Sequence, residues 1–407
     1  MSRRSAGRPL PDRPGLSVVI VGAGIGGLTA ALTLSAGGHD VTLVERATGF
    51  SAVGAGLQLS PNASRVLIDL GLGAPLRRAA GEPERVRIRS LAAGREIGAV
   101  ALGATMREHF GAPYWVIHRA DLQTVLLDAV RSRPGIRLLV GRTATSLAQT
   151  TAAASVTVET EAGRSETLTA ELVVCADGVR SALRPRLDRR PLRRHGAAAW
   201  RATLPRAAVP PGFCANETGL WLGRDRHVVH YPIHGGERIN LVAVMPQAAG
   251  EADWSAPGDP ARITAAFADA AGPLRGLLAT PAAWLAWTLA DRPAARPMAR
   301  GRIALLGDAA HPVLPFLAQG AALAIEDAAE LAACLAADPV ANALARYAAA
   351  RSARAGQVQA QARRNGRIYH AGPLVAAARD TVMARLGPER MTTRYAWLYG
   401  WRPEAHP

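Results

Sequence analysis

A glycine-rich run followed by an acidic residue is the first place in the chain where chemistry can be inferred. The run Gly22-Ala23-Gly24-Ile25-Gly26-Gly27 follows an apolar, β-branched stretch, and Glu45 ends the next such stretch. In this pattern Gly22 allows a tight turn, Gly24 lets the backbone approach a pyrophosphate and Gly27 lets a helix pack on a strand. The helix N-terminus offers N–H groups to the phosphates, and Glu45 can accept a hydrogen bond from a ribose hydroxyl. The pattern predicts an adenine-dinucleotide site and does not distinguish NAD from FAD.

Local patterning supplies the elements that would hold this loop. We predict a strand over Leu16–Val21, a helix over Leu28–Ser35 and a strand over Asp40–Val44. Two further buried strands end in related motifs: Leu172–Cys175 precedes Ala176-Asp177-Gly178, and Arg302–Leu306 precedes Gly307-Asp308. We expect these distant pieces to join in one parallel sheet, with the segment between them forming a second domain. The fold class is therefore α/β.

The composition excludes several kinds of chemistry. All 48 basic residues are arginine, so enzymes that need a primary amine are ruled out, among them Schiff-base and pyridoxal enzymes, Walker-A proteins and Ser-Lys hydrolases. The net charge is +16, but the arginines are spread along the chain without the interleaved aromatic residues of nucleic-acid readers. We therefore expect no nucleic-acid partner.

The cysteines and the apolar segments indicate the compartment. Cys175, Cys214 and Cys334 have no disulfide or metal-ligand spacing, so we predict no metal site and reduced thiols. The most apolar segment, Ile303–Leu335, is interrupted by charged residues and prolines, and we predict no membrane insertion. Residues 1–14 are interpreted as a loose tail, and the location as cytoplasmic.

Three motifs stand in an order that resembles a known family. They are the glycine run with Glu45, then Cys175-Ala176-Asp177-Gly178-Val179-Arg180-Ser181, then Gly307-Asp308-Ala309-Ala310-His311-Pro312. Over almost its whole length the chain resembles the group A FAD-dependent aromatic monooxygenases, of the salicylate and 3-hydroxybenzoate hydroxylase type. The resemblance implies the p-hydroxybenzoate hydroxylase-like fold, with a Rossmann-like FAD-binding domain of discontinuous segments, an inserted β-sheet substrate domain and a helical C-terminus. The implied boundaries are residues 15–82, 112–185 and 293–350 for the FAD-binding domain, 83–111 and 186–292 for the substrate domain, and 351–407 for the C-terminal region.

The resemblance also implies which residues bind FAD. Asp308 would accept from a ribityl or ribose hydroxyl, Arg119 would reach the phosphate and ribityl region, and small residues near Gly56 would let the flavin ring approach the backbone. Simpler interpretations remain open, since Asp308 could be a helix cap, Arg119 a surface helix residue and Asp177 a turn residue. The complete predicted set is Gly22, Gly24, Gly26, Gly27, Glu45, Arg46, Gly56, Arg119, Asp177, Asp308, Gly320 and Ala321.

The implied chemistry is reduction of FAD by NAD(P)H, reaction with O₂ to a C4a-hydroperoxyflavin and transfer of one oxygen to an activated aromatic ring. A phenolate reacts better than a phenol, so a histidine base is expected near the substrate hydroxyl. By resemblance we predict His230 for this role, with His311 as a competing candidate and a structural sheet histidine as the simpler interpretation. Because side chains alternate along a strand, only one of His230 and Tyr231 can face the flavin, so Tyr231 stays a catalytic candidate and which of the two faces it stays open. Pro315 and Gln319 are expected near the reactive edge of the flavin, and Arg180 or Arg201 near the donor or the substrate.

The sequence therefore predicts an FAD-dependent, NAD(P)H-using enzyme that hydroxylates a small phenolic or aromatic acid, as a monomer or homodimer. The ring position, the choice of NADH or NADPH and the oligomeric state stay open. Two alternatives are a monooxygenase or epoxidase for a larger apolar molecule, such as a polyketide, quinone precursor or carotenoid, and a flavin-binding regulatory protein without turnover.

Overall fold

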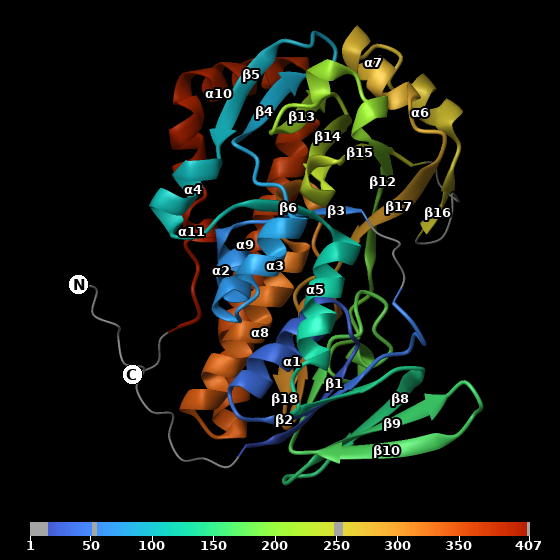
Figure 1. Ribbon diagram of the computed structural model, residues 1–407, viewed down its shortest axis with the longest axis vertical. Coiled ribbons are helices and arrows are strands. Elements are labelled where there is room, and N and C mark those ends of the chain that lie inside the picture. Colours follow the sequence, from blue (N-terminus) through green and yellow to red (C-terminus); the bar gives the residue numbers. More distant parts are fainter. Residues whose placement is uncertain (1–14, 51–54, 248–254, 405–407) are drawn as a thin grey trace.

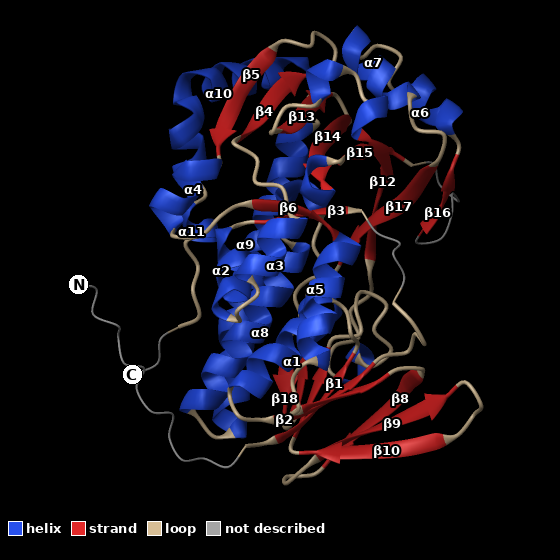
Figure 2. Ribbon diagram, viewed as in Figure 1, coloured by secondary structure: helices blue, strands red, loops and turns tan. Residues whose placement is uncertain are grey.

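Two large β-sheets organise the chain, with long helices running between them (Figures 1 and 2). The computed structural model describes residues 15–50, 55–247 and 255–404. The predicted loose tail, residues 1–14, lies outside these segments. In the view of Figure 2 the six-stranded sheet lies near the bottom of the molecule and the eight-stranded sheet at the top. The larger cavity described below is lined by turns that follow strands of the six-stranded sheet and by strands of the eight-stranded sheet.

The six-stranded sheet joins pieces that are far apart in the sequence. β1, β2, β7, β11 and β19 are parallel, and β18 pairs antiparallel to β19 at one edge. The four apolar residues that end β1 are all buried, as expected of a strand covered on both faces. This arrangement confirms the predicted α/β sheet of discontinuous segments. The strand order is β18 (Ala299–Arg300), β19 (Ile303–Leu305), β11 (Leu172–Cys175), β1 (Ser17–Val21), β2 (Asp40–Val44) and β7 (Ile136–Leu139).

The helix after the glycine run begins earlier than the sequence predicted. α1 spans Ile25–Ala36, so Gly26 and Gly27 lie in its first turn. A Cβ at Gly27 would lie 1.8 Å from the carbonyl oxygen of Gly22, and one at Gly26 would lie 2.7 Å from Leu306. Both positions require glycine because a Cβ at either would clash with the neighbouring loop or side chain and displace the start of α1.

The eight-stranded sheet is built from residues 85–101 and 193–291. β14 lies in its middle and pairs antiparallel with both β13 and β15, whereas β13 pairs parallel with β4. The strand order is β16 (Ser255–Gly258), β17 (Trp284–Asp291), β12 (Arg193–Pro205), β15 (Arg238–Pro246), β14 (Arg226–Ile233), β13 (Thr218–Gly223), β4 (Arg85–Ser90) and β5 (Glu96–Ala101).

Two small sheets and the helices complete the structure. The three-stranded sheet contains β8 (Arg142–Gln149), β9 (Ala154–Thr160) and β10 (Ser165–Ala170), and β3 (Gly56–Leu59) pairs with β6 (Trp115–His118). The remaining helices are α2 (Pro61–Asp69), α3 (Gly73–Ala79), α4 (Gly103–Phe110), α5 (Arg119–Arg131), α6 (Pro260–Ala266), α7 (Gly272–Ala279), α8 (Gly320–Ala337), α9 (Val340–Tyr369), α10 (Pro373–Thr393) and α11 (Ala396–Tyr399). Within the described segments, no helix combines the length and the apolar character that crossing a membrane requires.

The two faces of the eight-stranded sheet pack against different partners. On one face Val228, Leu241 and Ala243 pack with residues of α6 and α7 such as Ile263 and Leu274. On the other face Leu220, Tyr231 and Ile233 belong to a core with residues of α9, α10 and α11. Strand residues therefore face either a closed core or the helices around the cavities, and β14 shows this alternation most clearly. The domain boundaries drawn from the sequence stay a prediction.

Candidate active site

A cavity of about 530 Å³ lies between the glycine loop and the second face of the eight-stranded sheet. This volume is typical of a site for a small molecule or cofactor. Its lining includes the N-terminal ends of α1 and α8 and the turns that follow β11 and β19. Twelve of the residues predicted for the site line it, namely Gly24, Gly26, Gly56, Arg119, Asp177, Arg180, Arg201, Tyr231, Asp308, Pro315, Gly320 and Ala321.

The glycine loop leaves open space at the place where a ligand backbone would approach. A Cβ at Gly24 would meet nothing within 4 Å. Gly22 does not line the cavity; it has φ +102°, and a Cβ there would lie 2.5 Å from the carbonyl oxygen of Ala176. Neither α1 nor α8 has an acidic residue in its first turn. Two helix N-termini whose first turns contain no carboxylate offer backbone N–H groups to an anion.

Glu45 and Arg46 lie outside the cavity lining. The Glu45 carboxylate accepts hydrogen bonds from the backbone N–H of Ala23 at 2.8 Å and of Ala47 at 2.9 Å. Arg46 is exposed. Glu45 thus holds the glycine loop against the end of β2, and the predicted contacts of both residues with the cofactor stay predictions.

Two aspartates face the cavity from the turns after β11 and β19. Asp177 accepts through one oxygen from the backbone N–H of Leu183 at 3.4 Å, while its buried Oδ1 has no hydrogen-bond partner among the described residues. Asp308 is accessible from the cavity, and Arg119 lines the same space. Burial raises the pKa of both aspartates. Unsatisfied carboxylate oxygens, a nearby guanidinium and two helix N-termini fit a ligand that carries hydroxyls and phosphates, as FAD does.

A buried ionic network that the sequence analysis missed holds the turn after β19. Asp327 accepts from the backbone N–H of Gly307 at 2.8 Å and lies 2.6 Å from His311 Nε2. Arg351 pairs with both Asp327 and Glu326, and Arg184 donates to the carbonyls of Ala309 and Ala310. The signal in the sequence was the group of three acidic residues, Glu326, Asp327 and Glu330, inside a mainly apolar helix, because buried charges require partners.

The base predicted from the sequence lies on the wrong face of β14. His230 packs edge-on to Phe213 at 5.1 Å and near Trp221, in the closed core with α6 and α7. It is 4% exposed and lines neither cavity. Burial lowers its pKa to about 3, helped by the charge of Arg89. His230 therefore cannot reach a substrate in the cavity, and the prediction that it is the catalytic base is wrong.

The opposite face of the same strand carries the groups that reach the cavity. His227, Val229 and Tyr231 all line it, in agreement with period-two alternation. Burial lowers the pKa of His227 well below its ordinary value, so this imidazole is neutral and can accept a proton. The register pairs Val229 with Val242. Sequence reasoning missed His227 because it chose the wrong phase of the alternation.

Arg201 continues this face across the sheet. On β12, Arg201 pairs in register with Val242 of β15, and Val242 pairs in turn with Val229 of β14, the strand that carries His227. From strand spacing and rise, the Cα atoms of His227 and Arg201 are about 12 Å apart. Burial lowers the pKa of Arg201, whereas the neighbouring Tyr231 raises it. Its Nε is buried without a partner among the described residues, so this guanidinium can still bind an anion.

Gln319 does not reach the cavity, contrary to the prediction. It is 1% exposed, donates to Ser60 Oγ at 2.9 Å and accepts from Asn62 Nδ2 at 3.0 Å. Its amide is therefore occupied by the protein and orders the start of α8. Gly56 lines the cavity, and a Cβ there would lie 2.5 Å from the Tyr231 ring; its predicted contact with the flavin stays a prediction. The protein's own packing requires this glycine, before any approach of a flavin ring.

A second cavity of about 380 Å³ opens beside the first, under α10. The two share Gln58, His227, Val229, Pro315 and Ala318, so His227 lies where they meet. The second cavity is lined mainly by apolar side chains, including Ile88, Phe316, Val382, Met383 and Met391. An aromatic ring beside His227 would thus have apolar walls on this side.

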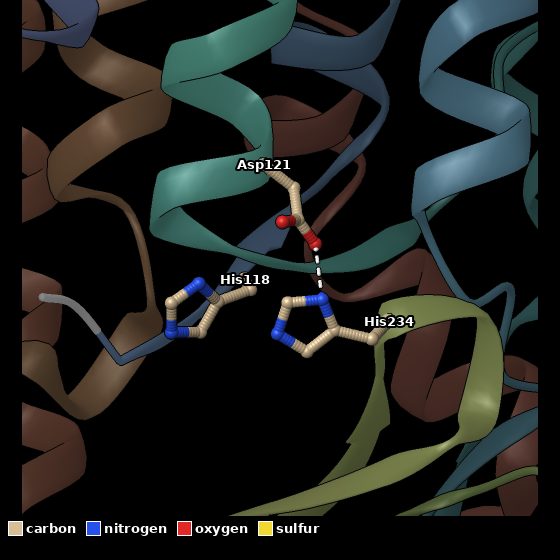
Figure 3. A group of neighbouring side chains, drawn as sticks. All are labelled: His118, Asp121 and His234. Carbon is tan, nitrogen blue, oxygen red and sulfur yellow. Dashed lines mark ion pairs between the residues drawn. The ribbon is translucent and has the colours of Figure 1, made fainter. Parts of the chain in front are cut away.

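Figure 3 shows a further cluster of His118, Asp121 and His234, in which donor atoms lie within 4.8 Å of one another. His234 Nδ1 is 2.8 Å from Asp121, and the rings of His118 and His234 are stacked at 4.8 Å with 27° between their planes. His118 Nδ1 also accepts from the backbone N–H of Ala120. Stacked rings direct their in-plane lone pairs side by side rather than at one point, so this geometry favours a clamp between α5 and the turn after β14 over a metal centre.

Fold and site together define a class of protein: a two-sheet α/β enzyme whose cavity accepts a dinucleotide beside a small-molecule site. Comparisons with known proteins agree. The model of the FAD binding domain family matches residues 15–362. The 3-hydroxybenzoate 6-hydroxylase of Klebsiella oxytoca is 33% identical over 96% of this chain and 98% of its own length. The 3-amino-4-hydroxybenzoate 2-monooxygenase of Streptomyces cremeus is 36% identical over 95% of each chain.

Solved structures show the same relationship. The structure of Klebsiella pneumoniae HpxO complexed with FAD and uric acid matches with a TM-score of 0.83 and 26% identity over 94% of this chain and 96% of that one. A salicylate hydroxylase substrate complex matches with a TM-score of 0.78 and 25% identity over 95% and 96%. The chain belongs to the FAD binding domain family. It is an FAD-dependent monooxygenase, as its sequence predicted.

Proposed function

We propose that the chain hydroxylates a small aromatic acid that carries a phenolic hydroxyl, with NAD(P)H as reductant and O₂ as the source of oxygen. The observation that carries this proposal is the face of the eight-stranded sheet between His227 and Arg201. A neutral imidazole, an apolar floor of Val229 and Val242 and an incompletely bonded guanidinium follow one another there. A phenol, an aromatic ring and a carboxylate are the groups that complement these three features.

Each of these side chains has a defined part in the reaction. Arg201 binds the carboxylate and sets the orientation of the ring, and the valine pair supports one ring face. His227 accepts the phenolic proton and so makes the ring electron-rich. Pro315 and Phe316 close the site from the side of the second cavity and limit the access of water. When bound, FAD supplies the redox and oxygen-transfer chemistry.

The cofactor residues follow from the cavity lining. Gly24, Gly26 and the α8 residues Gly320 and Ala321 would contact the phosphates through backbone N–H groups, with Arg119 as counter-charge. Asp177 and Asp308 would accept from the hydroxyls of the cofactor. The free thiols of Cys175, Cys214 and Cys334 fit a reducing compartment, and we propose a cytoplasmic location.

A second candidate is a larger, apolar phenol. The specific observation in its favour is the cavity under α10, which continues from His227 and is mainly apolar. A substituent of the ring could lie there against mainly apolar side chains. In this case Arg201 would contribute less to substrate binding than it does for an aromatic acid.

The test is a panel of phenols assayed with the FAD-loaded protein for stimulated NADH and NADPH oxidation, with product identification. The panel should pair hydroxybenzoates with the corresponding phenols that lack a carboxylate, and with phenols that bear an alkyl chain. We expect hydroxylated product from the acids, and a strong loss of this preference in Arg201→Gln. Preference for alkylphenols would favour the second candidate, and NADH oxidation that no phenol stimulates would contradict both.

A further inference from the structure

His227 is in direct contact with a second histidine, His370. The distance between His227 Nδ1 and His370 Nε2 is 2.8 Å, and the ring centroids are 5.0 Å apart with 38° between the planes. This separation is that of a nitrogen-to-nitrogen hydrogen bond, which needs one proton between the two rings. His370 is the C-cap residue of α9 and stands 143 positions away in the sequence, so no local pattern could indicate the pair.

The pair leads from the cavity toward the surface. His227 is 4% exposed and is enclosed by Phe316 and Tyr369, each with its ring 5.6 Å away. His370 is half-buried on the outer side of His227. Next to it lies the turn between β13 and β14, where the N–H of Asp225 donates to the carbonyl of His370 at 3.3 Å. The Asp225 side chain is 66% exposed.

Burial lowers the pKa of both His227 and His370, so both imidazoles are neutral at neutral pH. A positive charge on His370 would lower the pKa of His227 further, and the Asp225 carboxylate partly opposes the shift at His370. The cations nearby have partners. Arg224 lies 3.5 Å from Asp225, and Arg379 of α10 pairs with Asp380 and donates to the carbonyls of Ile368 and Tyr369.

We propose that His370 is a proton relay that connects His227 to solvent and acts through His227 without touching the substrate. This proposal rests on the proposed function, in which His227 takes the phenolic proton. The substrate O–H bond breaks and its proton goes to His227 Nε2. The proton on His227 Nδ1 then moves to His370 Nε2, and the proton on His370 Nδ1 leaves to water near Asp225. When the product regains its phenol, the same path returns a proton in the opposite direction.

The relay solves a specific electrostatic problem. If His227 kept the phenolic proton, an imidazolium would stay enclosed beside Phe316 and Tyr369. Holding a charge in such an apolar place is costly. When His227 passes a proton to His370, His227 stays neutral. The positive charge then leaves the protein as the proton that the half-exposed ring of His370 releases to water.

The experiment measures proton release when a phenolic acid binds to the oxidised, FAD-loaded protein, by stopped flow with a pH indicator in weak buffer. Absorbance of the bound phenolate follows ionisation in the same mixing. His370→Gln keeps a hydrogen-bonding side chain but cannot relay a proton, and His370→Ala leaves space for added imidazole. We expect both variants to slow proton release roughly 100-fold, and imidazole to restore the rate in His370→Ala. The control is His109→Gln, at an exposed histidine of α4, which should behave as the unmodified protein.

Proton release at the unmodified rate in both His370 variants would overturn the relay, since it would show that water reaches His227 by another path. The same conclusion would follow if both variants bound FAD and phenolic acid normally and imidazole failed to accelerate His370→Ala. The proposed function fails differently, because then the unmodified protein would release no proton with any phenolic acid. Nitrogen NMR of labelled histidines gives a readout without substrate: His370→Gln should shift the His227 Nδ1 resonance, and an unchanged resonance would contradict the contact.

Discussion

His227 and His230 stand three residues apart on β14 and have opposite fates. Both are 4% exposed, and burial lowers the pKa of both. His227 lies where two cavities meet and has His370 as a hydrogen-bond partner. His230 lies among Phe213, Trp221 and Arg89, and its Nδ1 has no partner among the described residues.

Access to a cavity, and not a lowered pKa, distinguishes His227 from His230. A lowered pKa follows from burial on either face and does not by itself indicate function. Access to a cavity and a route for the proton are found only on the face of His227.

Replacing His227 should have the largest effect on turnover. In His227→Gln we expect hydroxylation to slow by about 10²–10⁴-fold, because the phenolic proton loses its acceptor, while FAD remains bound. Product formation in single-turnover experiments is the measurement, and flavin absorbance after gel filtration controls for cofactor loss. Turnover close to that of the unmodified enzyme would remove His227 from the mechanism.

Arg201 tests whether the face of His227 also selects an acid. Loss of one charged hydrogen-bonding partner costs about 1.5–3 kcal/mol, so Arg201→Gln should raise KM for a hydroxybenzoate roughly 10–100-fold. For a phenol without a carboxylate KM should change little. A matched control is Arg262→Gln, since Arg262 lies over the Trp200 ring on the other side of the sheet. Equal losses for both substrates would mean that Arg201 does not bind the carboxylate.

Much of the fold and of the cofactor site could be predicted because the necessary information is local. Gly22, Asp177 and Asp308 follow buried strands, and the strands that carry them join one sheet. The substrate side depends instead on the phase of one strand and on distant contacts. From the sequence alone either His227 or His230 could face the substrate. The packing of β14 against α9 and α10 on one side and against α6 and α7 on the other decides which of them does.

Gln319 illustrates the second limit of the sequence. It is the N-cap residue of α8, and Ser60 and Asn62, about 260 residues earlier, occupy its amide. The hydrogen bond between His227 and His370 likewise joins residues that are 143 positions apart in the sequence. Hydrogen bonds over such separations leave no periodic signal.

His230 should affect stability in acid rather than catalysis. We expect His230→Leu to keep hydroxylation and FAD binding, because the side chain touches neither cavity. At pH 7 the change removes a buried, incompletely bonded ring, and the free energy of unfolding should change by less than about 1.5 kcal/mol. Turnover that falls as far as in His227→Gln would contradict the comparison of the two faces.

The pH dependence of this variant has a definite sign. The folded-state pKa of His230 is lowered to about 3, whereas the unfolded value is 6.5. Below pH 6.5 the unfolded chain therefore binds a proton that the folded chain excludes, and stability falls as the pH drops toward 3. Between pH 7 and pH 5 this residue should account for a loss of about 2 kcal/mol. Urea unfolding at both pH values should show that smaller loss in His230→Leu, and equal losses would contradict the lowered pKa.

A third histidine, His234, lies just after β14 and should show the smallest effect. It is partly exposed, pairs with Asp121 and stacks on His118 (Figure 3). It lines neither cavity, so His234→Ala should leave hydroxylation and phenol binding unchanged. A partly exposed polar pair of this kind contributes about 0–1 kcal/mol, so the loss in unfolding free energy should stay within that range. Asp121→Asn is the matched variant for the double-mutant cycle that measures the coupling energy of the pair. A large loss of turnover in His234→Ala would show that access to the cavities is not the criterion that separates reactive from structural histidines.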